Sequence, residues 1–200
     1  MRKALILTVA LMLGAGIAAA ADELIVTELM YNSTEDVDVE WIEIYNNSGT
    51  TLDLTGWYVL DDNIDHTRVP LSGTMGPGDV MLLVGTEALF TAKHPGVTNY
   101  FPAYFQEVGD TWSLGNGGDG VSIHNASAEP VFTMAYDDAS PWPTGCDGGG
   151  PSLLLLDNDC GDYSDGSCWT EGETDGTPGV LTQTVPNEDS SWGGLKSLYR

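Results

Sequence analysis

Basic side chains are scarce in this sequence. Lys and Arg together number 6 of 200 residues, against 30 Asp and Glu, so the formal net charge is −24 at pH 7. Affinity for nucleic acid depends on Lys and Arg that neutralise phosphates, and anionic membranes attract the same side chains. The composition therefore excludes nucleic acid as a partner and disfavours anionic lipid. Divalent cations, basic proteins and a salty environment all suit such a surface.

Long hydrophobic runs are absent beyond the beginning of the chain. The basic pair at 2–3, the apolar stretch 4–17 and the small residues 18–21 form the three parts of a secretory signal with an A-x-A cleavage site. The apolar stretch is short for a membrane span, which needs about 20 residues. We therefore expect residues 1–21 to be removed and the protein to be secreted or attached to the cell surface, without an integral membrane segment.

Cysteine is almost absent, and its three copies are Cys146, Cys160 and Cys168. In an exported protein this number predicts one disulfide and one leftover thiol. We prefer the pair Cys160–Cys168, because it closes a loop rich in Gly, Asp and Ser that has little apolar content. Cys146–Cys160 is the competing pair. No C-x-x-C spacing or neighbouring His indicates zinc.

The apolar residues that remain fall into short segments separated by turn residues. Candidate strands lie at 24–30, 39–45, 57–60, 80–84, 121–124, 131–135 and 152–156. Seven short strands with frequent turns are typical of a β-sandwich. The sequence therefore predicts an all-β domain over residues 22–180, with one short helix at 87–94, followed by a flexible tail over 181–200.

The candidate strand at 39–45 shows alternation without a clean polar face. Ile42 and Ile44 share one face, Trp41 and Tyr45 share the other, and each face also carries glutamate. We expect the two isoleucines to point into the core and the two aromatic side chains to pack against loops or the tail.

Several blocks of sequence, taken in order, carry a family resemblance. The opening blocks are LIVTELMYN at 24–32, EWIEIYNN at 40–47 and LDLTGW at 52–57, and later pieces lie at 77–79, 114–121, 148–153 and 176–179. Over roughly residues 24–180 the chain resembles a lamin tail domain in its bacterial, secreted form. The resemblance implies an immunoglobulin-like β-sandwich used for attachment or association, and it supplies no catalytic residues. The nucleic-acid contacts of nuclear lamins are not carried over, because the basic surface is missing.

Sequence motifs that are typical of enzymes are either absent or lie in a segment of the wrong predicted structure. Glycines at 115, 117 and 120 match a dinucleotide fingerprint, but the segment after them predicts a strand instead of the required helix, so a hairpin turn is the better interpretation. His66, His94 and His124 lie in separate segments without ligand spacing, and no G-x-S-x-G elbow is present. We therefore predict that the protein is not an enzyme.

Calcium is the one candidate cofactor, because hard cations prefer several oxygen ligands from a flexible loop. Its candidate ligands are Asp157, Asp159, Asp162 and Asp165. The spacing matches a helix-loop-helix calcium motif poorly, since Asp162 stands where glycine is needed and Cys168 stands where glutamate is needed. The alternative is a solvated acidic loop closed by a disulfide.

The last eleven residues, 190–200, differ from the polar stretch before them. Apolar side chains at three- and four-residue spacings accompany two basic ones in the set Trp192, Leu195, Lys196, Leu198, Tyr199 and Arg200. The hypothesis is a docking or sorting peptide that folds on a surface, because so short a segment is not a stable helix alone. An unstructured end without a role is the alternative.

These observations predict a secreted, non-catalytic interaction module that acts in adhesion, scaffolding or envelope association. Its partner is a protein or a carbohydrate. The alternative from another class is an accessory or cryptic calcium-dependent hydrolase.

Overall fold

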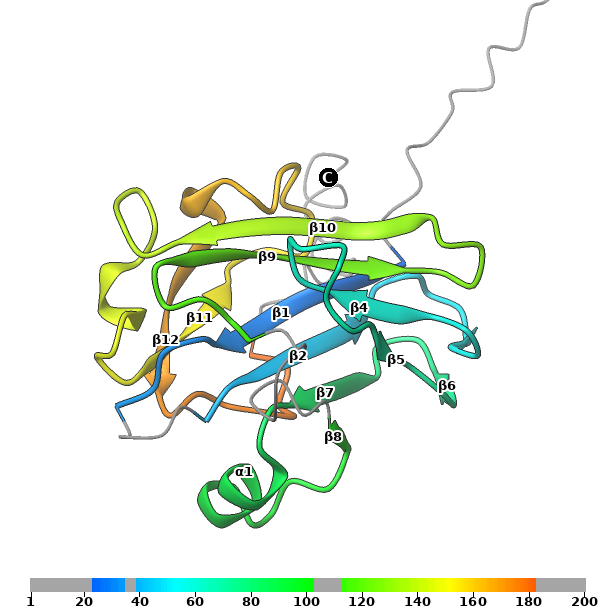
Figure 1. Ribbon diagram of the computed structural model, residues 1–200, viewed down its shortest axis with the longest axis horizontal. Helices are drawn as coiled ribbons and strands as arrows, with labels where there is room; N and C mark the ends of the chain where they lie inside the picture. Colours follow the sequence, from blue (N-terminus) through cyan, green and yellow to red (C-terminus); the bar gives the residue numbers. More distant parts are fainter. Residues whose placement is uncertain (1–22, 35–38, 103–112, 183–200) are drawn as a thin grey trace, which may run out of the picture.

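Short apolar segments of this chain pair into two main sheets that face each other (Figure 1). The computed structural model describes residues 23–34, 39–102 and 113–182. The larger sheet has the strand order β12-β11-β1-β2-β7-β8. Its strands are β1 (Leu24–Met30), β2 (Trp41–Asn46), β7 (Val80–Val84), β8 (Tyr100–Pro102), β11 (Pro151–Leu155) and β12 (Trp169–Thr174).

The smaller sheet has the order β10-β9-β4-β5. Its strands are β4 (Tyr58–Leu60), β5 (Val69–Pro70), β9 (Gly118–His124) and β10 (Pro130–Asp137), and a separate pair joins β3 (Leu52–Asp53) to β6 (Thr74–Met75). The helical elements are α1 (Glu87–Lys93), η1 (Thr144–Cys146) and η2 (Gly166–Cys168). The fold is an all-β, immunoglobulin-like sandwich, as predicted.

The main core lies between the two sheets. Ile42 and Ile44 of β2 are fully buried in it, together with Val121 and Ile123 of β9, so the predicted inward face of β2 is confirmed. Tyr45 also belongs to this core cluster and does not pack only on loops.

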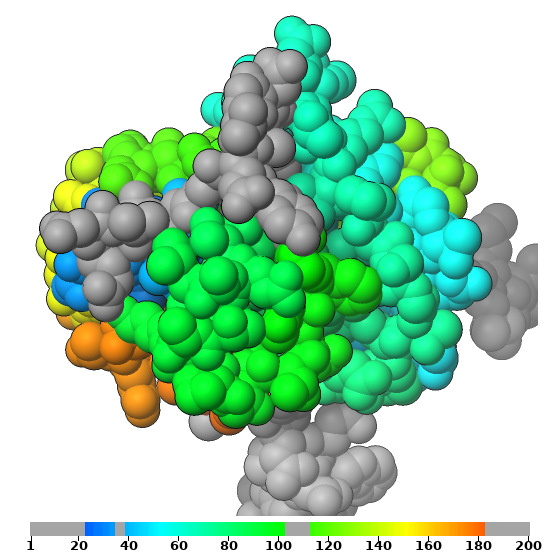
Figure 2. Space-filling view, turned by 60° about the horizontal axis from the view of Figure 1, so that its bottom comes forward, coloured from blue at the N-terminus to red at the C-terminus, as the bar shows by residue number. Residues whose placement is uncertain are grey.

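A second, smaller core covers the outer face of the six-stranded sheet. Trp41, Leu82 and Val84 pack there against Phe90 of helix α1. In Figure 2 the green residues around α1 and β8 form the front of the molecule over this face. Trp41 is therefore fully buried, against helix α1 and also against the loop that follows β12, so the expected loop contact is present and the helix adds to it. Because both faces of β2 are covered, its sequence lacks a polar face.

The chain after β12 crosses the outer face of the same sheet. Asp175 forms an ion pair with Lys93 of α1, at 2.6 Å. Gly176 lies against Trp41, and Leu181 packs against the main core. The last residues of the described chain thus belong to the sandwich. No helix within these described stretches is both long and apolar enough to cross a membrane.

Candidate functional site

Strand β10 offers the longest edge of the smaller sheet. It spans eight residues and ends the strand order of that sheet, with β9 as its neighbour. Phe132, Met134 and Tyr136 point into the core and are buried, whereas Thr133 and Ala135 are exposed on the outer face. This alternation follows the period of two expected of a strand that covers a core with one face.

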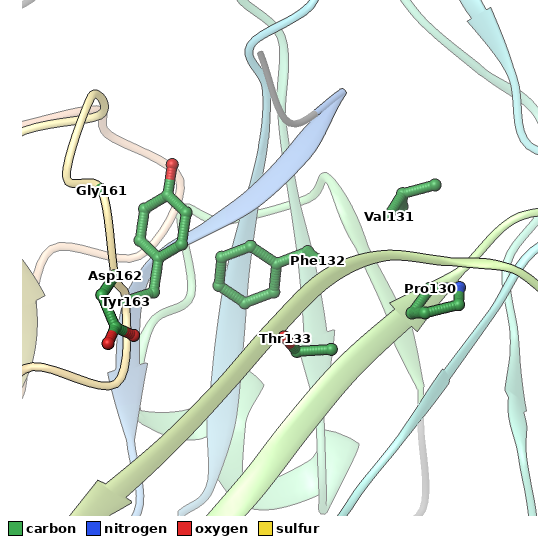
Figure 3. Close-up of a pocket in the computed structure, with 7 residues that line it drawn as sticks. All are labelled: Pro130, Val131, Phe132, Thr133, Gly161, Asp162 and Tyr163. Carbon is green, nitrogen blue, oxygen red and sulfur yellow. The ribbon is translucent and has the colours of Figure 1, made fainter. Parts of the chain in front are cut away.

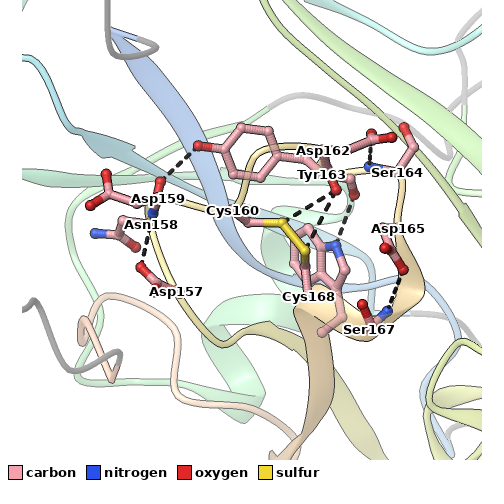
Figure 4. Close-up of a disulfide and its surroundings, with 11 residues drawn as sticks. Asp157, Asn158, Asp159, Cys160, Asp162, Tyr163, Ser164, Asp165, Ser167 and Cys168 are labelled. Carbon is pink, nitrogen blue, oxygen red and sulfur yellow. Dashed lines mark hydrogen bonds between the residues drawn. A yellow bond between two sulfur atoms is a disulfide. The ribbon is translucent and has the colours of Figure 1, made fainter.

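Residues 157–168 form a loop beside this edge, here called the disulfide loop. Cys160 and Cys168 are joined in it by a disulfide (Figure 4). Their Cα atoms lie 6.2 Å apart. Tyr163 anchors the loop in two ways: its hydroxyl donates to the Asn158 carbonyl at 2.8 Å, and its own carbonyl accepts from Trp169 Nε1 at 2.9 Å. The disulfide that the sequence favours is thus present, and it braces a loop with few apolar side chains.

A groove separates the disulfide loop from the first half of β10, and we call it the β10 groove. Its lining residues are Pro130, Val131, Phe132, Thr133, Gly161, Asp162 and Tyr163, and its volume is about 260 Å³. The rings of Phe132 and Tyr163 lie next to each other within it (Figure 3). Their centroids are 4.9 Å apart. Farther along the strand, the groove ends where the Ala135 amide donates to Ser164 Oγ at 3.0 Å.

A second hollow adjoins the groove on the outer face of the smaller sheet. It has a volume of about 420 Å³ and shares Pro130 and Thr133 with the β10 groove. Leu60, Ile64 and Ala135 contribute to its largely apolar lining. The Ile64 side chain is 76 % exposed, which is unusual for so large an apolar group. We call this feature the apolar hollow.

The four candidate calcium ligands lie in the disulfide loop, but three of them cap the backbone. Asp157, Asp162 and Asp165 each accept from the amide two residues later, at 2.9, 3.0 and 2.9 Å. For Asp165, bonds from Ser167 lower the pKa of the carboxyl group.

No group of three acidic, His or Cys side chains within the described ranges is arranged to hold a metal ion.

The disulfide loop also contains a buried polar side chain, that of Asn158. The side chain of Asn158 is buried, and its amide oxygen and nitrogen have no hydrogen-bond partner among the described residues. Calcium binding at this loop stays a prediction.

Two glutamates lie buried at the centre of the larger sheet. Glu28 accepts from Ser152 Oγ and from both the amide and the hydroxyl of Thr177, at 3.0 and 2.8 Å for the latter two. Glu43 accepts from Thr27 Oγ1 at 2.7 Å and from the Gly179 amide at 2.9 Å. These bonds hold the segment after β12 against the larger sheet. The two carboxyl groups accept hydrogen bonds from this segment where it crosses the sheet, which is a structural role.

Burial governs the protonation of both glutamates. Loss of hydration raises the pKa of Glu43 to about 7 and also raises the pKa of Glu28, because the charged form is disfavoured away from water. The hydrogen bonds from Thr27 and Gly179 oppose this shift for Glu43, and the charge of Glu28 adds to it. Only one signal of this pair is present in the sequence, a glutamate within each of two apolar strands.

The three histidines have separate structural contacts. His66 Nδ1 lies 2.5 Å from Asp61 Oδ2, and His124 stacks on Tyr58 with centroids 4.8 Å apart. His94 packs against Phe90, where burial lowers the pKa of its ring. The structure therefore does not bring the histidines together.

Cys146, the third cysteine, is buried, and its thiol donates to the Ser152 carbonyl at 3.1 Å. Burial raises the pKa of this thiol to about 12, so at neutral pH it lacks the thiolate character of a nucleophile.

Comparison with known proteins decides the family. The family model described as Lamin Tail Domain matches residues 17–138. The chain belongs to the lamin tail domain family. No curated protein matches the sequence. A crystal structure of a DUF4876 family protein from Bacteroides thetaiotaomicron is similar at 12 % identity, with a TM-score of 0.49, covering 84 % of this chain and 74 % of that one.

The two walls of the β10 groove differ in their relation to the lamin tail domain match. Strand β10 lies within the matched residues, whereas the disulfide loop lies beyond them. The sequence pieces at 148–153 and 176–179 also lie beyond the match, yet β11 pairs directly with β1 in the sandwich. This lamin tail domain is therefore completed by strands that the family model does not cover.

The predicted docking peptide lies outside the described residues. This holds for all six of its side chains, Trp192, Leu195, Lys196, Leu198, Tyr199 and Arg200.

Proposed function

We propose that this lamin tail domain protein is a secreted, non-catalytic interaction module that acts in adhesion, scaffolding or envelope association. The observation that carries the proposal is the β10 groove, which joins an exposed strand edge to an adjoining apolar hollow. Strand edges and exposed apolar surfaces of this kind are used to bind other molecules. Family membership supports the same conclusion, because the lamin tail domain is an immunoglobulin-like module.

The polar groups that enzymes use serve structural roles here. Glu28 and Glu43 cap backbone amides, His66 pairs with Asp61, and the Cys146 thiol is buried with a raised pKa. Secretion is supported by the basic and apolar beginning of the chain and by the disulfide, since disulfides persist in oxidising compartments.

The function is tested by a capture experiment on the native cell surface. Mature protein is immobilised and exposed to solubilised surface material, and bound species are eluted by excess soluble protein. We expect a saturable protein or glycan partner that heat-unfolded bait does not retain. Absence of any saturable partner contradicts the proposal.

A turnover assay tests the alternative of a calcium-dependent hydrolase. The mature protein is incubated with nucleic acid, phosphodiesters and glycans, with and without added Ca²⁺ or Mg²⁺. We expect no hydrolysis under any condition. Reproducible turnover that is lost when Asp157 and Asp159 are replaced by Asn would overturn the non-catalytic role.

A further inference from the structure

The outer edge of β10 presents backbone groups to the β10 groove. In an antiparallel strand, the N–H and C=O of one residue point to the same side, and alternate residues point to opposite sides. The Ala135 amide points away from β9, because it donates to Ser164 Oγ. The backbone of Thr133, two residues earlier, therefore faces the same edge, and Thr133 lines the groove.

The opposite wall leaves room at this edge. Gly161 has no side chain, and a Cβ atom built on it meets no other atom within 4 Å. The Cys160–Cys168 disulfide and the Tyr163 hydrogen bonds hold the loop, so the space is part of a braced structure. An extended segment can thus lie between the loop and β10 without displacing a side chain of Gly161.

The faces on either side of this edge suit alternating side chains. Side chains of an added strand would point alternately to two faces. One set would lie beside Phe132 and Tyr163, whose rings form the floor of the groove. The other set would lie beside Thr133 and Ala135, at the margin of the apolar hollow.

The negative charge around the β10 groove determines which extended peptide segments it can attract. Asp162 lines the groove, and three more aspartates share its loop. Only two Lys or Arg side chains occur within residues 23–34, 39–102 and 113–182, and both are engaged elsewhere: Arg68 lies over the Tyr58 ring at 4.4 Å, and Lys93 pairs with Asp175. A cationic segment is therefore attracted to this edge, and an acidic one is repelled.

We propose that the β10 groove binds an extended peptide segment of a partner protein that carries Lys or Arg, and that this segment adds to the outer edge of β10 as a further strand. This mode uses main-chain hydrogen bonds for affinity and alternate side chains for specificity. The inference rests on the proposed function, because it names the site and the class of partner of the same interaction module.

The test uses a fluorescent peptide of eight residues, alternating Lys and Val with blocked ends, and measures its binding to the mature protein by anisotropy. Three matched peptides separate the contributions of hydrogen bonding and charge. N-methylation of alternate amides, made in both registers, removes strand hydrogen bonding at constant charge, and replacement of Lys by Glu reverses the charge. We expect at least tenfold weaker binding for the Glu peptide and for the N-methylated peptide whose methyl groups face β10, little change for the other N-methylated peptide, and weaker binding of the Lys–Val peptide in about 0.5 M salt.

Two tryptophan variants locate the site on the protein. Gly161→Trp fills the groove from a position with open space, and Gly96→Trp places the same side chain in open space after helix α1. We expect at least tenfold weaker peptide binding for Gly161→Trp and a change of less than twofold for Gly96→Trp. Melting curves are expected to match for both variants, so lost binding is not a loss of fold.

The proposal is overturned by absence of Lys–Val binding, by equal binding of both N-methylated peptides, or by equal binding to Gly161→Trp. If truncation after residue 189 is needed before the peptide binds, the tail of the chain is the occupant and the external partner is overturned. A native partner that Gly161→Trp retains in the surface capture overturns the groove assignment but leaves the interaction module in place. If neither the capture experiment nor the peptide assay detects binding, the interaction module and the groove assignment are both overturned.

Discussion

Glu28 on β1 and Glu43 on β2 are direct register partners across the larger sheet, and both are fully buried. A register shift between Val26 and Glu28 makes Thr27 the extra residue of a bulge, and its hydroxyl donates to Glu43. Two carboxyl groups are thereby placed side by side in an apolar sheet. Their carboxylates are tolerated because backbone and hydroxyl donors from 152 and 177–179 surround them.

The pH dependence of folding should reflect this pair. The pKa of Glu43 rises from 4.5 in a model peptide to about 7 in the fold, so the folded state binds more protons between these values. Stability is therefore greatest below pH 4.5 as far as Glu43 is concerned, and falls as pH rises to 7, by about 3 kcal/mol. Glu28 acts in the same direction.

Glu43→Gln should remove the loss of folding stability that Glu43 causes as the pH rises. The amide oxygen can accept from Gly179, and the amide nitrogen can donate to the Thr27 hydroxyl, so the hydrogen bonds are kept without the charge. We expect the variant to match the parent protein in thermal melts at pH 4 and to melt higher at pH 8. Glu23→Gln, which neutralises an exposed side chain, is the control for general charge repulsion. An equal rise in melting temperature at pH 8 in both variants would falsify the idea that the burial of Glu43 causes the loss of stability.

A methyl group at Gly176 should destabilise the fold strongly. This glycine has φ of +72°, and an added Cβ would overlap Trp41 and come within 2.9 Å of Glu28 Oε1. The positive φ and the overlap should together cost about 2 kcal/mol or more in Gly176→Ala. Gly161→Ala, whose Cβ meets open space, should change stability by less than about 0.5 kcal/mol in urea unfolding. Equal stability of the two variants would contradict the close packing of Gly176 against Trp41.

Substitutions at two neighbouring positions of β2 should differ in severity. Ile44→Asp puts an unpaired charge into the main core, at a cost of several kcal/mol, on the order of the stability of a whole domain. Tyr45→Ser removes a ring that is 8 % exposed at the edge of the same core, and it should lower the melting temperature while the protein still folds. Circular dichroism melts that rank the two variants in reverse would refute this assignment.

The cysteines should be distinguishable by chemistry. Non-reducing peptide mapping is expected to yield a Cys160–Cys168 peptide and a Cys146 thiol that reacts with iodoacetamide only after denaturation. Because the disulfide joins residues eight apart, its contribution to stability should lie near about 2 kcal/mol. A peptide that joins Cys146 to Cys160 is the contrary result.

Removal of residues 190–200 tests the docking hypothesis for the tail. We expect the melting temperature to stay within about 1 °C and the cell-associated fraction of the protein to change, as measured by fractionation and immunoblotting. A loss of about 1 kcal/mol or more means that the segment packs on its own domain. If neither quantity changes, the docking hypothesis is rejected.

The strands that alternate or carry long apolar runs are predictable from the sequence, and so is helix α1, to within one residue. Strand β12 is not, because only Trp169 is buried in that edge strand and its glycine and glutamates are typical of a loop. The two-residue strands β3, β5 and β6 are too short to show a period.

Less of the candidate site than of the fold can be predicted from the sequence. The Cys160–Cys168 loop could be inferred from composition, but the β10 groove depends on the loop packing beside a strand about thirty residues away, through Phe132 and Tyr163. The buried glutamates were also hidden, because a single-strand pattern cannot show that α1 and the segment after β12 cover the outer face. Long-range packing, and not local preference, determines both features.

The central position of β1 has a consequence for biosynthesis. This strand is among the first to be translated, yet one of its two neighbours, β11, begins at Pro151, and the caps on Glu28 come from Ser152 and Thr177. Contacts of such high sequence separation slow folding, and a nascent chain cannot complete its sandwich until nearly all of it is available. A polypeptide with this topology therefore leaves β1 without one neighbouring strand, and Glu28 without its hydrogen-bond donors, until the residues near 177 have been synthesised.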